Sequence, residues 1–310
     1  LVTEYTMSEI ISAVYDEIRN TGNPNGILFL DEINCISESL SAVMLQLFQN
    51  KTLGQSSLPE GWVLVMAGNP PEYNKSVKLF DAVTRDRLRI INVVPDAKAW
   101  LDYAEKHELN STVVSYISSN EDKIYSFDPA AAQVVTPRGW EELSINLDVF
   151  EKHGYPVTGE FISEFIGVPA AASEFLDYYN MVKENITDED IDKIISGEIR
   201  DALIKKIGGC GTNIRYMLIT CLKRRLRMMS AAKDYSKATA AMDNIVGFIT
   251  KLYGSGGEIE ILMGNILSDA EIVKMTIATH NANFSKYLNE VVNTGKEINS
   301  KLKNRRKEVK

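Results

Sequence analysis

The sequence predicts a small parallel α/β region followed by two all-helical regions. Two continuous apolar runs, 27–30 and 62–67, each end abruptly in polar or turn-forming residues. Runs of this kind are typical of strands that are buried on both faces of a parallel sheet. From Asp96 onward, apolar residues recur instead at the spacing of amphipathic helices. We therefore expect an α/β core over 1–95, a helical region over 96–185 and a helical extension over 186–310.

Helices and turns are expected around the two strands. Thr6 and Glu9 form a capping box, which predicts a helix over Thr6–Arg19. Ser37 is the expected N-cap of the next helix. The polar, turn-rich stretch Gln49–Gly61 has room for a small hairpin. A third strand is expected over Arg89–Val94, which ends at a proline.

The helical regions are expected to contain short amphipathic pieces first and longer helices later. The predicted segments before residue 186 are Ala97–Lys106, Ser111–Ile117, Pro137–Lys152 and Glu160–Val182, with an irregular stretch over Asp122–Thr136. About four helices are expected after Ile186, the last over Glu258–Lys307. The basic run 223–225 is interpreted as a solvated helix face, with an acidic partner surface as the less favoured alternative.

Composition limits the classes of function. The formal charge of −8 argues against binding nucleic acid through a broad basic surface. The three cysteines form no CxxC pair, and the three histidines lie far apart, so no metal-ligand pattern is visible. No apolar run approaches the length of a membrane span. We therefore expect a cytoplasmic protein that binds neither nucleic acid nor membrane.

Polar side chains follow both predicted strands at the point where each strand ends. Asp31 and Glu32 follow the first strand, and Asn69 follows the second. Open α/β sheets bind ligands at the carboxyl ends of their strands, so adjacent parallel strands would bring the three groups into one crevice. A carboxylate pair after a buried strand is also the Walker B pattern, in which Asp31 helps to hold Mg²⁺ and Glu32 polarises a water. The alternative is a strand that leaves its core through two solvated acids and a turn-forming asparagine.

Several short motifs in the first 185 residues resemble one family. They are Leu30-Asp31-Glu32-Ile33-Asn34, Gly61-Trp62-Val63, the stretch 67–74 (AGNPPEYN), Asp86-Arg87-Leu88 and the stretch 136–141 (TPRGWE). In this order they resemble the AAA+ ATPases, specifically the MoxR-like branch. The resemblance implies that 1–95 is part of the AAA+ core, that 96–185 is the lid, and that the cofactors are ATP and Mg²⁺.

The resemblance also implies residue roles. Asp31 would support Mg²⁺ and Glu32 would activate water, while Asn69 would be sensor 1. Arg87 would be the arginine finger, with Arg85 and Arg89 as rival candidates. An arginine suits this role because it stays charged and binds phosphate through two donors. A surface ion pair remains the alternative for Arg87.

Arg138 would be sensor 2, which touches the nucleotide phosphates from the lid. It follows Thr136 and Pro137, which have the pattern of an N-cap and a first helical residue. This places Arg138 in a first helical turn, where free backbone amides attract anions. A solvated arginine is the alternative.

The chain departs from the family at one point, because it contains no Gly-x-x-x-x-Gly-Lys-Ser/Thr phosphate-binding loop. In the family this loop precedes the Walker B strand, so the sequence that starts at Leu1 is expected to be the C-terminal part of an ATPase. The resemblance implies a ring of subunits, with a hexamer as the expected number, and a partner that bears a von Willebrand A domain. The alternative is an adaptor or scaffold that keeps the fold without hydrolysing ATP.

Overall fold

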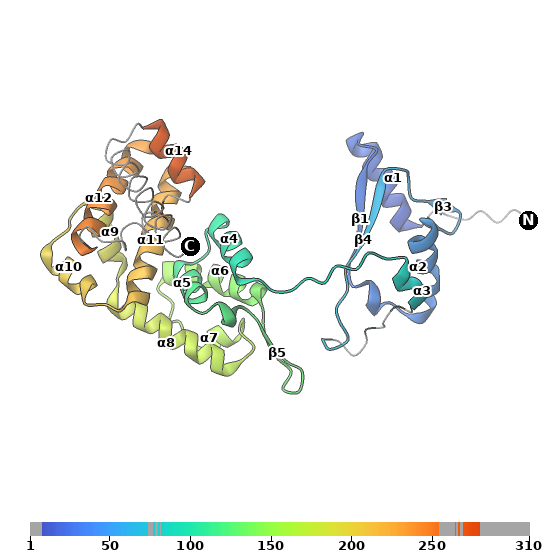
Figure 1. Cartoon of the computed structure of the whole chain (residues 1–310), viewed down its shortest axis with the longest axis horizontal. Helices are drawn as coiled ribbons and strands as arrows, with labels where there is room; N and C mark the ends of the chain where they lie inside the picture. The colour runs from blue at the N-terminus through green and yellow to red at the C-terminus, as the bar shows by residue number, and fades with distance from the viewer. Residues whose placement is uncertain are drawn as a thin grey trace, which may run out of the picture. The chain divides into compact units, whose positions relative to one another are not determined.

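The chain forms two compact units, 1–94 and 95–310, called here the sheet unit and the helical unit (Figure 1). The computed structural model describes residues 8–73, 77, 80, 82–253, 264, 266 and 269–279, of which 38–39, 41–42, 83–84 and 253 are described by their backbone alone. The helical unit has one hydrophobic core, whose members run from Ala97 to Met275. This core spans both helical regions that the sequence analysis separates at residue 185.

The sheet unit combines a parallel strand pair with three helices and a small hairpin. Its elements are α1 (Glu9–Thr21), β1 (Gly26–Leu30), a 3-10 turn (Ile33–Cys35), α2 (Glu38–Asn50), β2 (Thr52–Leu53), β3 (Ser56–Ser57), β4 (Trp62–Met66) and α3 (Ala82–Asp86). β1 pairs in parallel with β4, in a register that runs from Gly26 opposite Trp62 to Leu30 opposite Met66. The two predicted strands and their α/β setting are therefore confirmed.

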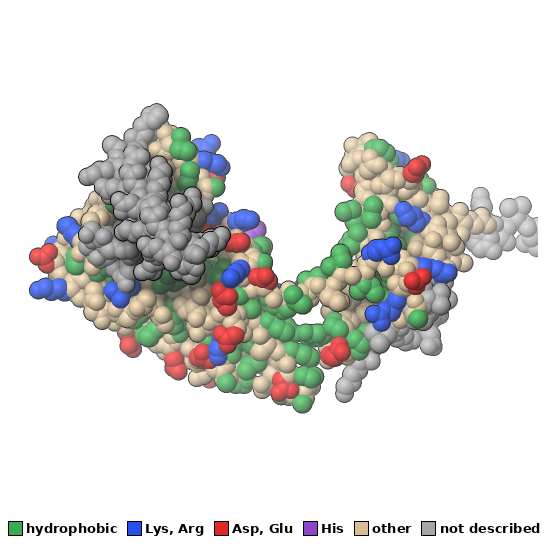
Figure 2. Space-filling view, in the orientation of Figure 1, with side chains coloured by type: hydrophobic (Ala, Val, Ile, Leu, Met, Phe, Trp, Pro, Cys, Tyr) green, Lys and Arg blue, Asp and Glu red, His purple; other side chains and the backbone are tan. Residues whose placement is uncertain are grey.

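One face of this sheet is exposed among the described residues. Leu28, Leu30, Leu64 and Met66 pack on the core formed with α1 and α2. On the other face Ile27, Phe29 and Val63 are 65%, 55% and 56% exposed, and Val65 lies beside them. Hydrophobic side chains accordingly gather over β1 and β4 in Figure 2. The expectation of strands buried on both faces is therefore wrong for the described part, because α1, α2 and the hairpin supply apolar cover for one face only.

Three further expectations for the sheet unit change. The first helix begins at Glu9 with Ser8 as its N-cap, and Thr6 lies outside the described residues. The predicted hairpin is confirmed as the antiparallel pair β2–β3, but it is only partly exposed, since Leu53 and Leu58 are buried. Arg89–Val94 is not a strand. A strand needs a hydrogen-bonded neighbour, and none pairs with this segment among the described residues.

The helical unit consists of helices and one small hairpin. Its elements are α4 (Ala97–Lys106), α5 (Ser111–Ser119), a 3-10 turn (Glu121–Ile124), β5 (Ser126–Asp128), β6 (Gln133–Val135), α6 (Pro137–His153), α7 (Gly159–Ser163), α8 (Pro169–Asn185), α9 (Asp188–Ser196), α10 (Asp201–Gly208), α11 (Thr212–Ala231), α12 (Tyr235–Tyr253) and α14 (Ala270–Ala278). Aromatic rings fill part of its core: Trp140 lies 5.5 Å from both Tyr116 and Phe175, measured between ring centroids. Trp140 Nε1 donates to the Lys123 carbonyl at 3.0 Å, so this fully buried indole keeps a hydrogen bond.

Several helical boundaries differ from the expectations. The segment predicted as irregular contains the β5–β6 hairpin. The single helix expected over Glu160–Val182 is two, α7 and α8, because Gly167 and Pro169 interrupt it. Five helices with described bounds follow Ile186, and Gly264 and Ile266 are helical as well, where about four helices were expected. α14 ends at Ala278, so no continuous helix runs over Glu258–Lys307, most of which lies outside the described residues.

Candidate functional site

Asp31 and Glu32 lie immediately beyond the carboxyl end of β1, and both are exposed. The turn that carries them is tight: Asp31 Oδ1 accepts from the Glu32 amide at 2.9 Å, and Glu32 has a left-handed backbone with φ 51°. A non-glycine residue rarely adopts this conformation, which costs about 1–2 kcal/mol. The turn thus holds the carboxylates at the edge of the sheet in a strained backbone conformation.

The loop after β4 is hydrogen-bonded to the loop after β1. The Ala67 amide donates to the Leu30 carbonyl at 2.9 Å, and the Ile33 amide donates to the Ala67 carbonyl at 3.0 Å. The Asn34 side chain adds a third link, because its Nδ2 donates to the Asn69 carbonyl at 2.7 Å. The structure therefore brings Asp31, Glu32 and Asn69 to the same edge of the sheet, as the sequence analysis predicted.

Asn34 and Gly68 were not assigned a role in the sequence analysis, yet both shape this edge. The buried Asn34 Oδ1 lies against Gly68, where any Cβ would overlap it. A glycine is therefore required for the two loops to approach this closely. The sequence shows a glycine directly before Asn69, but it does not show that this glycine faces the Asn34 side chain in the folded protein.

The three candidate finger arginines lie in or just after α3. Arg85 is in the last turn of this short helix, and Arg87 and Arg89 follow it. All three side chains are exposed. The structure of a single chain therefore leaves all three free to contact a second molecule and does not choose between them.

Arg138 belongs to the helical unit, where it lies in α6. Thr136 is the N-cap of α6, and its Oγ1 accepts from the Gly139 amide at 3.0 Å; Pro137 is the first helical residue. The predicted cap is thus confirmed. Arg138 is exposed in the first turn.

The sheet edge offers carboxylates but few other groups that could hold a metal ion or a phosphate. Mg²⁺ is commonly held by one or two carboxylates, by waters and by phosphate oxygens, which suits Asp31 and Glu32. Within the described residues, no three His, Cys, Asp or Glu side chains gather into a metal site. The metal would therefore depend on a nucleotide for several of its ligands. The chain offers no lysine-bearing glycine loop to hold the phosphates.

The interpretation of 223–225 as a solvated face is wrong for its first two residues. The Lys223 side chain is 8% exposed and pairs with Glu105, while Arg224 pairs with Asp148. Burial lowers the pKa of Lys223 to about 8, with the nearby Arg227 charge acting in the same direction and Asp269 opposing them. Sequence periodicity missed these residues because their burial depends on how α11 packs against other helices.

Comparison of the chain with protein-family models, with curated proteins and with solved structures finds no match. In the part of the chain that the structure describes, no helix combines the length and the apolar character needed to cross a membrane.

Proposed function

We propose that the chain is part of an ATP-hydrolysing, ring-forming remodelling ATPase of the MoxR-like AAA+ type. The main support is the parallel pair β1–β4, which places a carboxylate pair and an asparagine at one sheet edge. Asp31 would hold Mg²⁺, Glu32 would activate the attacking water, and Asn69 would orient that water or contact the γ-phosphate. Phosphoryl transfer needs mainly positioning and charge stabilisation, which such groups provide.

Two arginines that lie outside this sheet edge would complete the proposed site. The resemblance assigns Arg138 to the phosphates of the same subunit and Arg87 to the site of a neighbouring subunit in the ring. Exposure of Arg87 is compatible with this role, since a finger must reach beyond its own subunit. A client that bears a von Willebrand A domain belongs to the same proposal.

The first test concerns the chain by itself. Calorimetric titration with Mg-ATP should show weak binding at most, because no loop in this sequence cradles the β- and γ-phosphates. Micromolar affinity would show that the phosphate site is formed by residues to which no such role is assigned.

The second test uses a protein in which this chain follows the phosphate-binding loop. Glu32→Gln should still bind ATP but hydrolyse it slowly, because the charge that polarises water is lost. Arg87→Ala should slow turnover by a factor of about a thousand or more. Glu60→Gln and Arg19→Ala are matched controls, because both residues are exposed elsewhere in the sheet unit.

Mixing the Glu32→Gln and Arg87→Ala variants tests whether Glu32 and Arg87 act on the sites of different subunits. Glu32 acts in the subunit that binds the nucleotide, whereas Arg87 acts on the neighbour, so mixed rings should regain part of the activity. If subunits exchange and activity stays at the level of the single variants, Arg87 does not act in trans, and Arg85 and Arg89 become the candidates. If the unmodified protein binds ATP without hydrolysing it, the non-hydrolysing scaffold replaces the ATPase.

A further inference from the structure

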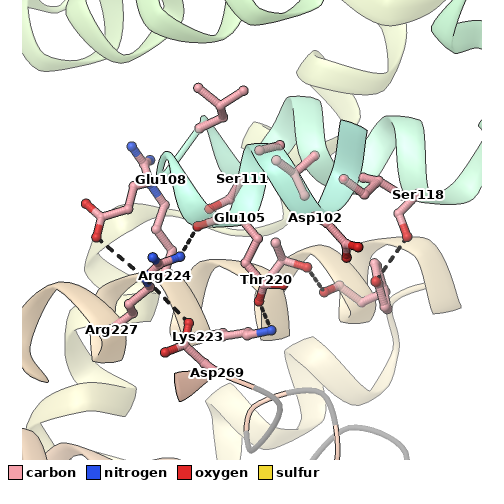
Figure 3. A pocket seen from close by; sticks show the side chains of 15 residues that line it. Asp102, Glu105, Glu108, Ser111, Ser118, Thr220, Lys223, Arg224, Arg227 and Asp269 are labelled. Carbon is pink, nitrogen blue, oxygen red and sulfur yellow. Dashed lines mark hydrogen bonds and ion pairs between the residues drawn. The ribbon is translucent and has the colours of Figure 1, made fainter. Parts of the chain in front are cut away.

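The helical unit contains a cavity that the proposed ATPase does not use. Its volume is about 120 Å³, and it lies between α4, α5 and α11, with Asp269 before α14 also on its wall (Figure 3). Residues of α11 line it at positions 216, 220, 223, 224 and 227, which form one stripe of that helix. Cavities of this order accept a ligand of about the size of benzene.

The wall is apolar on one part and carries hydroxyl groups on another. The apolar part is formed by Leu101, Ala104, Leu109 and Val114. Ser118 Oγ donates to the Tyr216 hydroxyl at 3.0 Å, and Thr220 Oγ1 donates to the Tyr216 carbonyl at 3.1 Å. The Tyr216 hydroxyl oxygen accepts in the first of these bonds, and its second lone pair is available to a donor group of a ligand.

Most charged groups on the wall are already engaged with one another. Lys223 pairs with Glu105. The Arg227 Nε lies 3.7 Å from Glu108 Oε1 and 3.5 Å from Asp269 Oδ2. Asp269 also caps α14, by accepting from the Glu271 amide at 2.9 Å and the Ile272 amide at 3.2 Å.

Asp102 differs from the other acids of the wall. Within the described part of the chain its side chain has no hydrogen bond and no ion pair, although it projects from α4 toward α11 at the Ser118 end of the cavity (Figure 3). The wall as a whole has an excess of carboxylate. The wall carries four carboxylates, those of Asp102, Glu105, Glu108 and Asp269. They face two cations, Lys223 and Arg227, because the third cation of the wall, Arg224, pairs with Asp148 outside the cavity.

We propose that this cavity binds a small organic cation, an amine whose ammonium group pairs with Asp102 and whose hydrocarbon part packs on the apolar wall. The excess of negative charge disfavours an anion. A bare divalent metal fits poorly, because three of the four carboxylates are held by Lys223, Arg227 or the cap of α14. An ammonium group needs only one free carboxylate and a hydroxyl acceptor, and Asp102 and Tyr216 supply both.

The test compares three probes with one carbon skeleton: butylamine, butanol and butyrate. Ligand-observed NMR on the intact chain at neutral pH should show saturable binding of butylamine, on the order of millimolar affinity for so small a molecule. Butanol should bind at least about tenfold more weakly, because a charge-assisted hydrogen bond is lost. Butyrate should not bind.

The assignment to Asp102 is tested by substitution. Asp102→Asn should weaken butylamine binding at least about tenfold, whereas Asp177→Asn, an exposed acid on α8, should leave it unchanged. Circular dichroism should show that both variants are folded, since neither residue is buried. Equal affinity for butanol and butylamine, tighter binding of butyrate, no saturable amine binding, or an unchanged affinity in Asp102→Asn would each overturn the proposal. Because the site lies wholly in the helical unit, its failure says nothing about ATP hydrolysis.

Discussion

The two units bury their apolar residues to very different extents. The helical unit buries large aromatic side chains such as Trp140, Tyr116 and Phe175 completely or almost so, inside one continuous core. The sheet unit has a much smaller core, and among its described residues one face of β1–β4 is left exposed. Parallel sheets normally have both faces covered. The comparison shows that the helical unit has a large continuous core of its own, while the described part of the sheet unit leaves one apolar sheet face exposed.

The largest expected effect tests whether the helical unit folds on its own. Trp140→Ala should lower the unfolding free energy of this unit by about 3–5 kcal/mol, because it leaves a cavity and removes the bond to the Lys123 carbonyl. Urea unfolding followed by circular dichroism measures this loss. In a Trp100→Phe background Trp62 is the remaining tryptophan, so its fluorescence reports the sheet unit separately and should be unaffected if the units unfold independently. Val149→Ala, at an exposed position of the same helix, is the control and should stay within about 0.5 kcal/mol.

The second prediction concerns the edge of the sheet. Gly68→Ala should destabilise the sheet unit by about 1–3 kcal/mol, because the added methyl group would overlap the Asn34 amide. Gly247→Ala is the matched control in the helical unit, since a Cβ there meets open space in the middle of α12. That control should be neutral or stabilising, because alanine is a better helix former. Equal losses in both variants would mean that the contact with Asn34 has no effect.

The sequence predicted which residues lie at the carboxyl edge of β1 and β4 better than it predicted which segments form strands of the sheet. The apolar runs before Asp31 and Asn69 specify buried strands locally, and parallel neighbours necessarily end at the same edge. The apolar run Arg89–Val94 looked equally strand-like. It is not a strand in the structure, because pairing depends on a neighbour that local sequence does not reveal. The link between Asn34 and Asn69 was missed for the same reason.

In the helical unit, the sequence predicted where a capped helix begins, but it did not predict which polar side chains are buried by contacts between helices. Thr136 and Pro137 correctly placed the start of α6. The β5–β6 hairpin was missed because its strands are only three residues long and its turn is made by Asp128, whose side chain accepts from two nearby amides. Lys223 was interpreted as solvated, because its burial arises only when α11 packs against other parts of the helical unit. The spacing of apolar residues along the sequence therefore gave no indication of the candidate amine site.

The third prediction is a pH dependence of the stability of the helical unit, which results from the burial of Lys223. Its pKa is about 8 in the folded protein and about 10.5 in the unfolded chain, so the unfolded state binds more protons between these values. The stability of the helical unit should therefore rise as pH increases from about 8 to 10.5. The charged groups that surround Lys223 are Glu105 on α4, Asp269 before α14 and Arg227 on α11.

The measurement is a series of urea unfolding curves across that pH range. Lys223→Met keeps the length of the side chain without the charge, and it should remove most of the rise. Lys237→Met is the control, because Lys237 is largely exposed and pairs only with its neighbour Asp234. A rise of equal size in Lys223→Met would assign the pH dependence to other groups.

The smallest expected effect tests the exposed face of the sheet most directly. Val63 and Leu64 are successive residues of β4 that point to opposite faces, and only Leu64 packs on the core. Leu64→Ala should therefore cost on the order of 2 kcal/mol, whereas Val63→Thr should stay within about 0.5 kcal/mol, since threonine keeps the branched shape and the strand preference. Binding of a hydrophobic dye should fall in Val63→Thr, because the exposed apolar face becomes more polar. If Val63→Thr were as costly as Leu64→Ala, the face would already be covered in the folded chain, and the contrast between the two units would disappear.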